Sequence, residues 1–409
     1  MNLPLFLARK MKGGGVSSAS NTIALISVAV SIFAMVLAIS LSEGFKKEIA
    51  KRSVGFNGEI LLIPPGQGFS NDRYPIEANL SYIDEISSLE SVSSVEAVAY
   101  KPGMIKNDDR LRGAFFKGVD SLYDLSFFEE SLSEGRMPDF SGKKPSNEIL
   151  ISERMAALMG YKVGDKVTAY FIGEDVKARR FVISGLFDIR FEDLDEQFVL
   201  ADIRHIRRLN GWSENGSSSI EVKLSGGKRD EVASQIGEII MERDITMQDS
   251  SVAVCTVDEL FPVLFDWLSL LDLNVLVVIV LMIVVAAVNM ITGLLIILFE
   301  KTSMIGLLKS MGMKNRDVCL LFLYRGAQIV LRGMVWGNCI AAAVLLIQKY
   351  THLFKLDPMN YYVDYIPVDF NLANIAVINV GAFLLISAVM VIPSLVISTI
   401  SPDKSLRVE

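Results

Sequence analysis

Four long runs of apolar residues constrain this chain more than any other feature of its sequence. A helix needs roughly 20 predominantly apolar residues to cross the hydrocarbon layer of a bilayer, which is about 30 Å thick. Hydrophobic residues make up 51% of the 409 residues, and charged stretches separate the runs, so the chain combines membrane and non-membrane parts. The runs cover residues 22–41, 273–299, 327–347 and 375–400.

The first apolar run follows Arg9, Lys10 and Lys12, as the core of a secretory signal does. Its length exceeds the roughly 7–15 residues that are typical of such a core. We therefore interpret the run as an uncleaved transmembrane anchor.

Lysine and arginine in the short loops predict which side of the membrane each loop faces. Basic residues gather before the first run, in the loop between the second and third runs, and in the tail at Lys404 and Arg407. The loop 348–374 carries more acidic than basic residues. We therefore expect a multi-pass protein with both termini in the cytoplasm, and with the loop 348–374 and the segment 43–272 on the other side.

The segment between the first two runs is typical of an α+β domain, because short β-rich runs alternate with helical ones at irregular spacing. Its single cysteine, Cys255, excludes an internal disulfide, and about 230 residues can hold together by core burial alone. A helical pattern over 257–271 predicts a stalk that continues into the second run. The expected strands are 58–63, 95–100, 114–119, 166–171, 180–188 and 219–224, and the expected helices are 81–89, 152–159, 202–209 and 229–241.

The predicted fold class is an integral membrane protein with four transmembrane α-helices and a large α+β extracytoplasmic domain inserted between helices 1 and 2. Its segments are a cytoplasmic N-terminal segment (1–21), helix 1 (22–43), the α+β domain (44–256), a stalk helix (257–272), helix 2 (273–299), a cytoplasmic loop (300–317), helix 3 (318–347), an outer loop (348–373), helix 4 (374–400) and a cytoplasmic tail (401–409).

Small residues recur at helical spacing in two of the apolar runs, where they would let helices approach closely. Packing within one chain and an interface between subunits both explain this pattern. The residues concerned are Gly333, Gly337 and Ala341 in the third run, and Ala286, Asn289 and Gly293 in the second.

Two arginines and one proline interrupt the last two runs. Arg325 and Arg332 lie one heptad apart, and they act either as boundary residues whose charges reach the interface or as a functional pair. Pro393 predicts a kink near the end of the fourth helix.

Several motifs of enzymes and metal proteins are absent. The sequence contains no G-x-x-x-x-G-K-[ST] loop, H-E-x-x-H, G-x-S-x-G or cysteine pair at metal-ligand spacing, and His205 and His352 are far apart. The net charge of −7 argues against a nucleic-acid partner. We therefore expect no catalytic residue, no metal site and no cofactor in this chain.

The loop 300–312 reads E-K-T-S-M-I-G-L-L-K-S-M-G and predicts a short amphipathic helix that stops at Gly312 in a left-handed conformation. Lys301 and Lys309 lie off its apolar stripe. By physics alone such a helix could rest on lipid headgroups. The stripe consists of Met304, Leu307, Leu308 and Met311.

This loop resembles the coupling-helix motif of FtsX/MacB-type ABC permeases, E-[RK]-T-x-x-I-G-[IL]-L-[KR]-[AS]-x-G. The resemblance implies that a separate cytoplasmic ATPase binds here. Met304 stands where many members carry a glutamate, so one polar contact is missing. The implied ATPase-coupling residues are Glu300, Lys301, Thr302, Ile305, Gly306, Leu308, Lys309, Met311 and Gly312.

The resemblance covers nearly the whole chain and narrows to the lipoprotein-releasing LolC/LolE group. The similar segments are E-G-R-M-P (134–138), E-I-L-I-S (148–152), V-G-D-K-V (163–167), F-V-I-S-G-L-F (181–187) with Asp195 downstream, Y-Y (361–362) through I-P-V (366–368), and I-S-P-D-K-S-L-R (400–407).

This group implies a type VII exporter in the cell inner membrane, with a MacB-like periplasmic domain. The implied partners are a LolD-like ATPase dimer that uses ATP and Mg²⁺, a second permease copy or a paralogue, a lipoprotein cargo, membrane lipid and a periplasmic lipoprotein carrier. ATP-driven closure would push the coupling helices, and the outer domains would extrude lipoprotein from the outer leaflet.

Where LolC-like members have a long carrier-binding hook, this sequence has only residues 172–179, which predict a tight hairpin. The implied carrier-binding residues are Ile172, Gly173, Glu174, Asp175 and Arg179.

Three alternatives remain open from the sequence. They are a MacB-like efflux permease for small molecules or peptides, a cell-division FtsX and a membrane receptor with no transport function.

Overall fold

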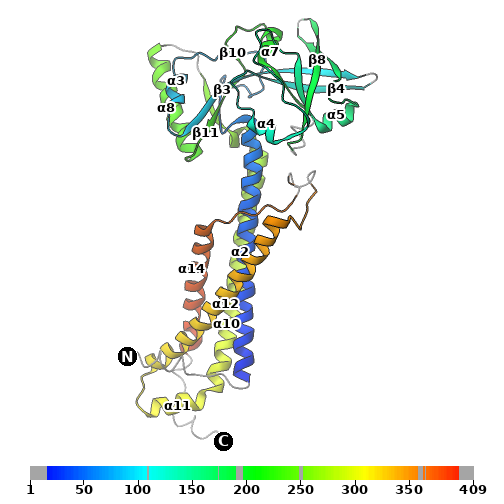
Figure 1. The fold of residues 1–409 in the computed structure, drawn as a ribbon. Coiled ribbons are helices and arrows are strands. Elements are labelled where there is room, and N and C mark those ends of the chain that lie inside the picture. Colours follow the sequence, from blue (N-terminus) through cyan, green and yellow to red (C-terminus); the bar gives the residue numbers. More distant parts are fainter. Residues whose placement is uncertain are drawn as a thin grey trace. The chain divides into compact units, whose positions relative to one another are not determined.

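The computed structural model describes residues 16–107, 110–173, 175–189, 197–247, 252–357, 363 and 365–395. The expected features at Asp195, 361–362 and 400–407 lie outside the described residues. The chain divides into two compact units, each treated separately below (Figure 1). The membrane unit comprises Met1–Lys47, Trp267–Lys355 and Tyr365–Glu409, and the outer domain comprises Glu48–Asp266 and Leu356–Asp364.

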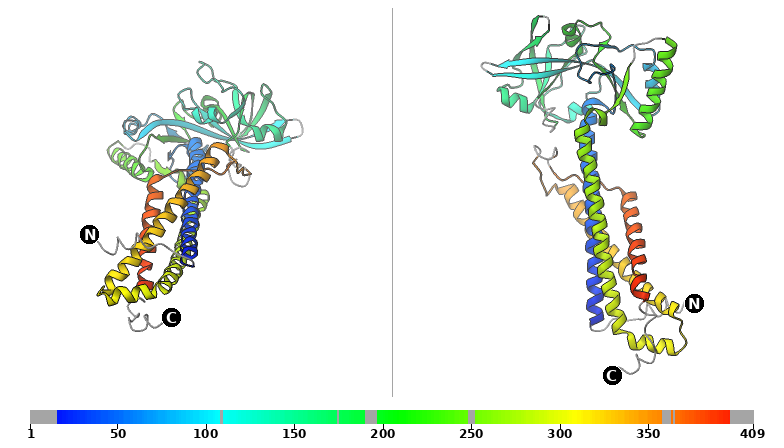
Figure 2. Two further views of the ribbon diagram at one scale, coloured as in Figure 1. Left: turned by 60° about the horizontal axis from the view of Figure 1, so that its bottom comes forward. Right: turned by 180° about the vertical axis from the view of Figure 1, so that it is seen from behind.

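Among the described residues, four helices are long and apolar enough to cross a membrane, which confirms the predicted four spans. Each of the first three is longer than the run that predicts it; α2, for example, continues past residue 43 to Asn57. Figures 1 and 2 show the four helices side by side, with the short helix α11 (Thr302–Ser310) between α10 and α12. They are α2 (Val16–Asn57), α10 (Pro262–Glu300), α12 (Asn315–Thr351) and α14 (Leu372–Val389).

Two prolines interrupt helices. The stalk is not the single helix that we expected over 257–272, because α9 (Val257–Leu260) ends at Leu260 and α10 begins at Pro262, with Phe261 between them. Phe261 precedes a proline, and the residue before a proline is disfavoured in the helical conformation. Pro262 itself suits the first position of a helix. At Pro393 we predicted a kink, and the structure has an interruption four residues before it: α14 ends at Val389 and α15 (Val391–Leu395) follows, since proline has no N–H for the carbonyl four residues earlier.

The third span packs closely on the first through its glycines. A Cβ atom at Gly337 would lie 2.6 Å from the carbonyl oxygen of Ala29, and one at Gly333 would lie 2.9 Å from the Cβ of Val28. Only glycine permits such an approach, so this face of α12 is covered by α2 of the same chain.

Polar side chains within the spans bind one another. Asn289 of α10 donates a hydrogen bond to the Ser27 hydroxyl of α2 at 2.6 Å. Asn338 of α12 and Asn379 of α14 exchange amide hydrogen bonds of 2.7 and 3.1 Å. These bonds join two pairs of spans, α2 with α10 and α12 with α14.

Two ion pairs join α2, just after its apolar run, to other parts of the membrane unit. Lys46 pairs with Asp272 of α10 at 2.5 Å, and Lys47 pairs with Asp369, just before α14, at 3.2 Å. Each pair is partly exposed and contributes about 0–1 kcal/mol, so together they align the helices more than they stabilise them.

The outer domain is α+β, as predicted, with a ten-stranded sheet in the order β12-β1-β11-β3-β4-β9-β6-β8-β5, in which β7 pairs with β3 and β8. The strands are β1 (Ile60–Ile63), β2 (Ile76–Glu77), β3 (Val92–Asn107), β4 (Arg110–Val119), β5 (Leu132–Gly135), β6 (Glu148–Ser152), β7 (Lys166–Ile172), β8 (Val176–Phe187), β9 (Phe198–Asp202), β10 (Gly216–Ser217), β11 (Ser219–Leu224) and β12 (Ala253–Thr256). The helices besides α9 are α3 (Ile83–Ser87), α4 (Ser126–Glu130), α5 (Glu153–Met159), α7 (Ile203–Asn210) and α8 (Arg229–Met247).

The six expected strands are present as β1, β3, β4, β7, β8 and β11, whereas β2, β5, β6, β9, β10 and β12 were not predicted. Of these, β6 and β9 lie inside the large sheet. Both are short, almost fully buried runs, and each has a parallel neighbour. Continuous apolar runs of this length cannot be distinguished from helix by periodicity. Ser152 and Asp202, the first residues of two expected helices, are N-caps, since their side chains accept hydrogen bonds from the backbone N–H groups of Met155 and Arg204.

A buried ion pair holds the carboxyl end of α2 in the outer domain. Lys117 of β4 and Glu221 of β11 are 1% and 0% exposed, with nitrogen and oxygen 2.8 Å apart. Lys117 also donates a hydrogen bond to the carbonyl of Phe56, in the last turn of α2. A cation at this end of a helix stabilises the unpaired carbonyls there.

Two tyrosines complete the surroundings of the Glu221 carboxylate. The Tyr123 and Tyr100 hydroxyls donate to it at 2.9 and 3.4 Å. Burial raises the pKa of both tyrosines well above the ordinary value, so both remain donors. Burial also lowers the pKa of Lys117, and Glu221 opposes that shift. The charges are therefore stable only as a pair.

We predict that Lys117→Met destabilises the protein by about 3–5 kcal/mol, because it leaves Glu221 buried without a cation. The double variant Lys117→Met/Glu221→Gln should lose less, since neither charge remains. Unfolding of the purified full-length chain in detergent, followed by tryptophan fluorescence, would measure both. Lys177→Met, which removes an exposed cation from β8, is the control. A double variant less stable than Lys117→Met would contradict the prediction.

We also predict that Gly337→Ala lowers stability by about 1–3 kcal/mol, because the added methyl group forces α12 away from α2. The matched control is Gly381→Ala in α14, where a Cβ would meet nothing within 4 Å. The same unfolding experiment compares the two. Equal midpoints for both variants would show that the close approach at Gly337 has no energetic importance.

Candidate functional site

Helix α11 begins immediately after α10 and ends in a glycine-terminated turn. The Thr302 hydroxyl donates to the Phe299 carbonyl at 2.7 Å, at the junction with α10. At the other end, the N–H of Gly312 bonds to the Lys309 carbonyl and the N–H of Met313 to the Leu308 carbonyl, both at 3.0 Å. Gly312 has a φ of 92°, so the predicted left-handed stop is confirmed as a Schellman motif.

One face of α11 is buried in the membrane unit. Ile305 is completely buried and belongs to the same hydrophobic core as Val318 and Leu321 of α12, and Gly306 is also buried. Backbone bonds from Lys301 to Ile297 and from Ile305 to Lys301 continue the pattern of α10 into α11. A displacement of α11 would therefore be transmitted directly to α10 and α12.

The opposite face of α11 is exposed and partly apolar. Leu307 is 54% exposed and Met311 is 77% exposed. Ser303 and Ser310 lie on the same exposed face at helical spacing. The predicted stripe is therefore divided, because Leu307 and Met311 face outwards and Ile305, outside the stripe, makes the inward contact.

The predicted ATPase-coupling residues consequently differ in position. Met311 and Gly312 are exposed, Glu300 and Lys301 form an ion pair at 3.2 Å, and Ile305 and Gly306 are inaccessible. Thr302, Leu308 and Lys309 are partly buried. Leu307 is not among the predicted coupling residues, although its spacing of four from Met311 indicates that the two share a helix face.

The predicted helix-packing residues lie inside the membrane unit. All except Asn289 are buried, and Asn289 forms the bond to Ser27 described above. This arrangement accounts for both small-residue patterns through packing within one chain. The buried residues are Ala286, Gly293, Gly333, Gly337 and Ala341.

The predicted hairpin connects β7 and β8, which pair up to the contact between Ile172 and Val176. Both residues are exposed and apolar, and Gly173, Asp175 and Arg179 are also exposed. Glu174 lies outside the described residues. The tip is thus a small surface that another protein could contact.

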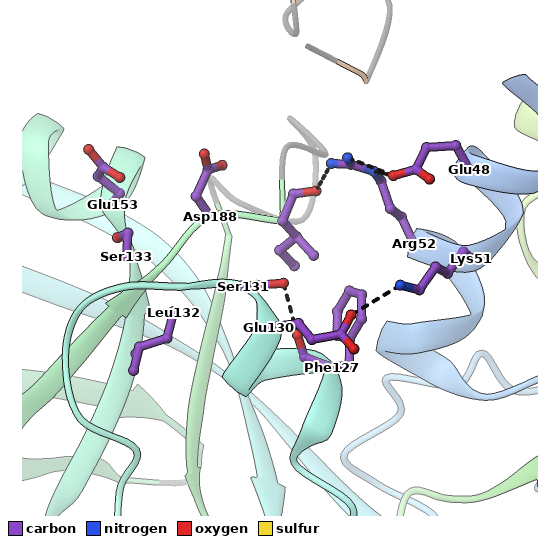
Figure 3. Close-up of a pocket in the computed structure, with 11 residues that line it drawn as sticks. Glu48, Lys51, Arg52, Phe127, Glu130, Ser131, Leu132, Ser133, Glu153 and Asp188 are labelled. Carbon is purple, nitrogen blue, oxygen red and sulfur yellow. Dashed lines mark hydrogen bonds and ion pairs between the residues drawn. The ribbon is translucent and has the colours of Figure 1, made fainter. Parts of the chain in front are cut away.

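A polar pocket of about 390 Å³ lies in the outer domain beside the last turns of α2 (Figure 3). Arg52 donates to the Ile189 carbonyl at 2.7 Å and pairs with Glu48 at 3.0 Å. Lys51 pairs with Glu130 of α4 at 3.0 Å. These contacts hold the last turns of α2 against the rest of the outer domain.

Next to that pocket, α2 packs closely on α4. A Cβ atom at Gly55 of α2 would overlap the ring of Phe127 in α4. Among the residues that the structure describes, no group of three His, Cys, Asp or Glu side chains could hold a metal ion.

Two family models together match most of the chain. The MacB-like periplasmic core domain matches residues 22–239, and the FtsX-like permease C-terminal domain matches residues 276–402. The first match includes α2 and most of the outer domain, and the second includes α11 with the three later spans.

Two similar proteins match this chain over nearly their whole length. The chain is 21% identical to "Lipoprotein-releasing system transmembrane protein LolC" of Neisseria meningitidis, over 98% of this chain and 97% of that one. It is 19% identical to the protein of the same name from Xylella fastidiosa, over 99% and 97% of the two chains. Among solved structures, the periplasmic region of MacB from Actinobacillus actinomycetemcomitans matches with 15% identity and a TM-score of 0.37, over 52% of this chain and 95% of that one. This chain belongs to the FtsX/MacB family of ABC transporter permeases and lies close to the LolC/LolE group.

Proposed function

We propose that this permease extracts lipoproteins from the outer leaflet of the cell inner membrane for transfer to the outer membrane, driven by a separate ATPase. The full-length similarity to proteins named as lipoprotein-releasing supports the cargo. In this arrangement, both termini and α11 face the cytoplasm, and the outer domain faces the periplasm.

The observation that carries the proposal is the pair of faces on α11. The buried face, with Ile305, packs into the core of the membrane unit, and the exposed face presents Leu307 and Met311. Exposed apolar side chains on a short helix at the membrane surface suit a groove on a partner protein. The partner would be a LolD-like ATPase dimer that binds ATP and Mg²⁺ itself.

Continuous helices could transmit motion between the membrane unit and the outer domain. Helix α2 contributes residues to the membrane unit and to the outer domain, as does α10. The carboxyl end of α2 is held by Lys117 within the outer domain, and α10 leads directly into α11. Rigid elements of this kind can convert a push on α11 into movement of the domain.

The remaining partners follow from the same proposal. A second permease, either another copy or a paralogue, would complete the path for cargo. The hairpin with exposed Ile172 and Val176 is the place to test for contact with a lipoprotein carrier.

We predict that Leu307→Asp/Met311→Asp weakens ATPase binding by about 30-fold, as expected when apolar residues at the centre of an interface become charged. Co-purification of the ATPase with the tagged permease measures this loss. Leu122→Asp is the matched control, because Leu122 is 88% exposed in the outer domain. Unchanged ATPase recovery with the double variant would refute the role of α11.

Depletion of the permease should cause mature lipoproteins to accumulate in the inner membrane, since their release would stop. Density separation of the two membranes, with metabolic labelling of acylated proteins, measures the distribution. Expression of the Leu122→Asp variant should restore release, and the α11 double variant should not. Normal release under depletion would exclude the lipoprotein cargo and favour efflux of another substrate.

A further inference from the structure

Two arginines in the third span line a cavity that the proposed function does not use. The cavity is about 250 Å³ and lies between α2 and α12, at the end of the membrane unit near α11. Its polar lining consists of Arg325, Gln328 and Arg332 of α12, with Asn21 and Thr22 of α2.

Neither arginine has a carboxylate partner among the described residues. Residues 1–21 contain no aspartate or glutamate, so that part of the chain cannot supply one. The Oδ1 atom of Asn21 is buried and accepts no hydrogen bond. The cavity thus offers two cations and one unused acceptor, which suits a ligand with an anionic group and a hydrogen-bond donor.

The level of the arginines corresponds to the boundary of the bilayer. Gly333 contacts Leu25 and Val28, so the neighbouring Arg332 lies beside the first turn of the apolar run of α2. Arg325 lies about 10 Å further towards α11, at roughly 1.5 Å per residue. Helical side chains lean towards the helix N-terminus, which directs both guanidinium groups towards the headgroup region.

An apolar groove of about 450 Å³ adjoins this cavity and shares Leu25 with it. Both α2 and α12 contribute to the groove, and its side chains are all apolar. An acyl chain would fit such a surface, because it contributes apolar area along its whole length. Besides Leu25, the groove includes Ile26, Val30, Phe33, Trp336 and Ile340.

We propose that the cavity and groove together bind one phospholipid, with its phosphate between Arg325 and Arg332 and an acyl chain in the groove. Asn21 accepts a hydrogen bond from the headgroup, which therefore carries an ammonium or a hydroxyl, as in phosphatidylethanolamine or phosphatidylglycerol. The lipid fastens α2 to α12 at the end that carries α11. This site does not depend on the lipoprotein cargo, which the proposed function places in the opposite leaflet.

The test is native mass spectrometry of the purified full-length protein, after equilibration with phosphatidylglycerol and removal of excess lipid. The wild type should retain one lipid, and Arg325→Gln/Arg332→Gln should bind it about 25-fold more weakly, since each basic residue near the surface contributes roughly fivefold. Lys314→Gln/Arg316→Gln is the matched control at the start of the same helix, with both side chains exposed outside the cavity. Equal retention by the arginine variant and the wild type would overturn the proposal.

A second variant separates a lipid from a free phosphate and does not alter the charges. Val30→Trp fills the groove from a partly exposed position and should also reduce lipid retention about tenfold or more. If Val30→Trp retains lipid normally and inorganic phosphate displaces it, the site recognises an anion and the lipid assignment fails. If the arginine variant keeps its lipid but no longer associates with a second permease, the arginines pair with a carboxylate of another chain, and the proposal is also wrong.

Discussion

The absence of water in the bilayer is the constraint on which the rest of this structure depends. A backbone that crosses hydrocarbon must form all its hydrogen bonds internally, which leaves helices as the only solution for four isolated apolar runs. The same constraint acts on side chains: Asn289 binds Ser27, and Asn338 binds Asn379 in both directions. Because apolar attraction cannot drive helix association in lipid, close packing at Gly333 and Gly337 and these few polar bonds determine which helices are neighbours.

A helix that crosses the membrane also provides a rigid connection to what lies beyond it. Helix α2 runs for 42 residues, more than its apolar run requires, and its last turn is bound by a buried lysine of the outer-domain sheet. Lys117 and Glu221 carry a large desolvation cost that a hydrophobic pair would avoid. A charge pair with aromatic donors tolerates little displacement, so it favours one specific docking of the helix end.

The nine residues of helix α11 must form both a buried face and an exposed face. Ile305 and Gly306 must be small or apolar enough to enter the core, whereas Leu307 and Met311 must remain outside it. Gly312 ends the helix with a conformation that other residues reach only at a cost of about 1–2 kcal/mol. This division explains why a single short motif contains both structural and contact positions.

Several features could be predicted from the sequence, because each depends on local composition or on one residue's preference. They are the number of spans, the α+β class of the outer domain, the two helix N-caps and the stop at Gly312. The uninterrupted stalk was a wrong prediction at Phe261, where the local effect of Pro262 outweighed the apolar pattern. Strands β6 and β9 were missed because their burial on both faces removes the alternation that identifies a strand. Only the tertiary structure decided which face of α11 is free, that Lys117 binds the end of α2, and that Arg325 and Arg332 share a cavity with Asn21. Those features depend on contacts between residues far apart in the chain, and such contacts leave no periodic signal in the sequence.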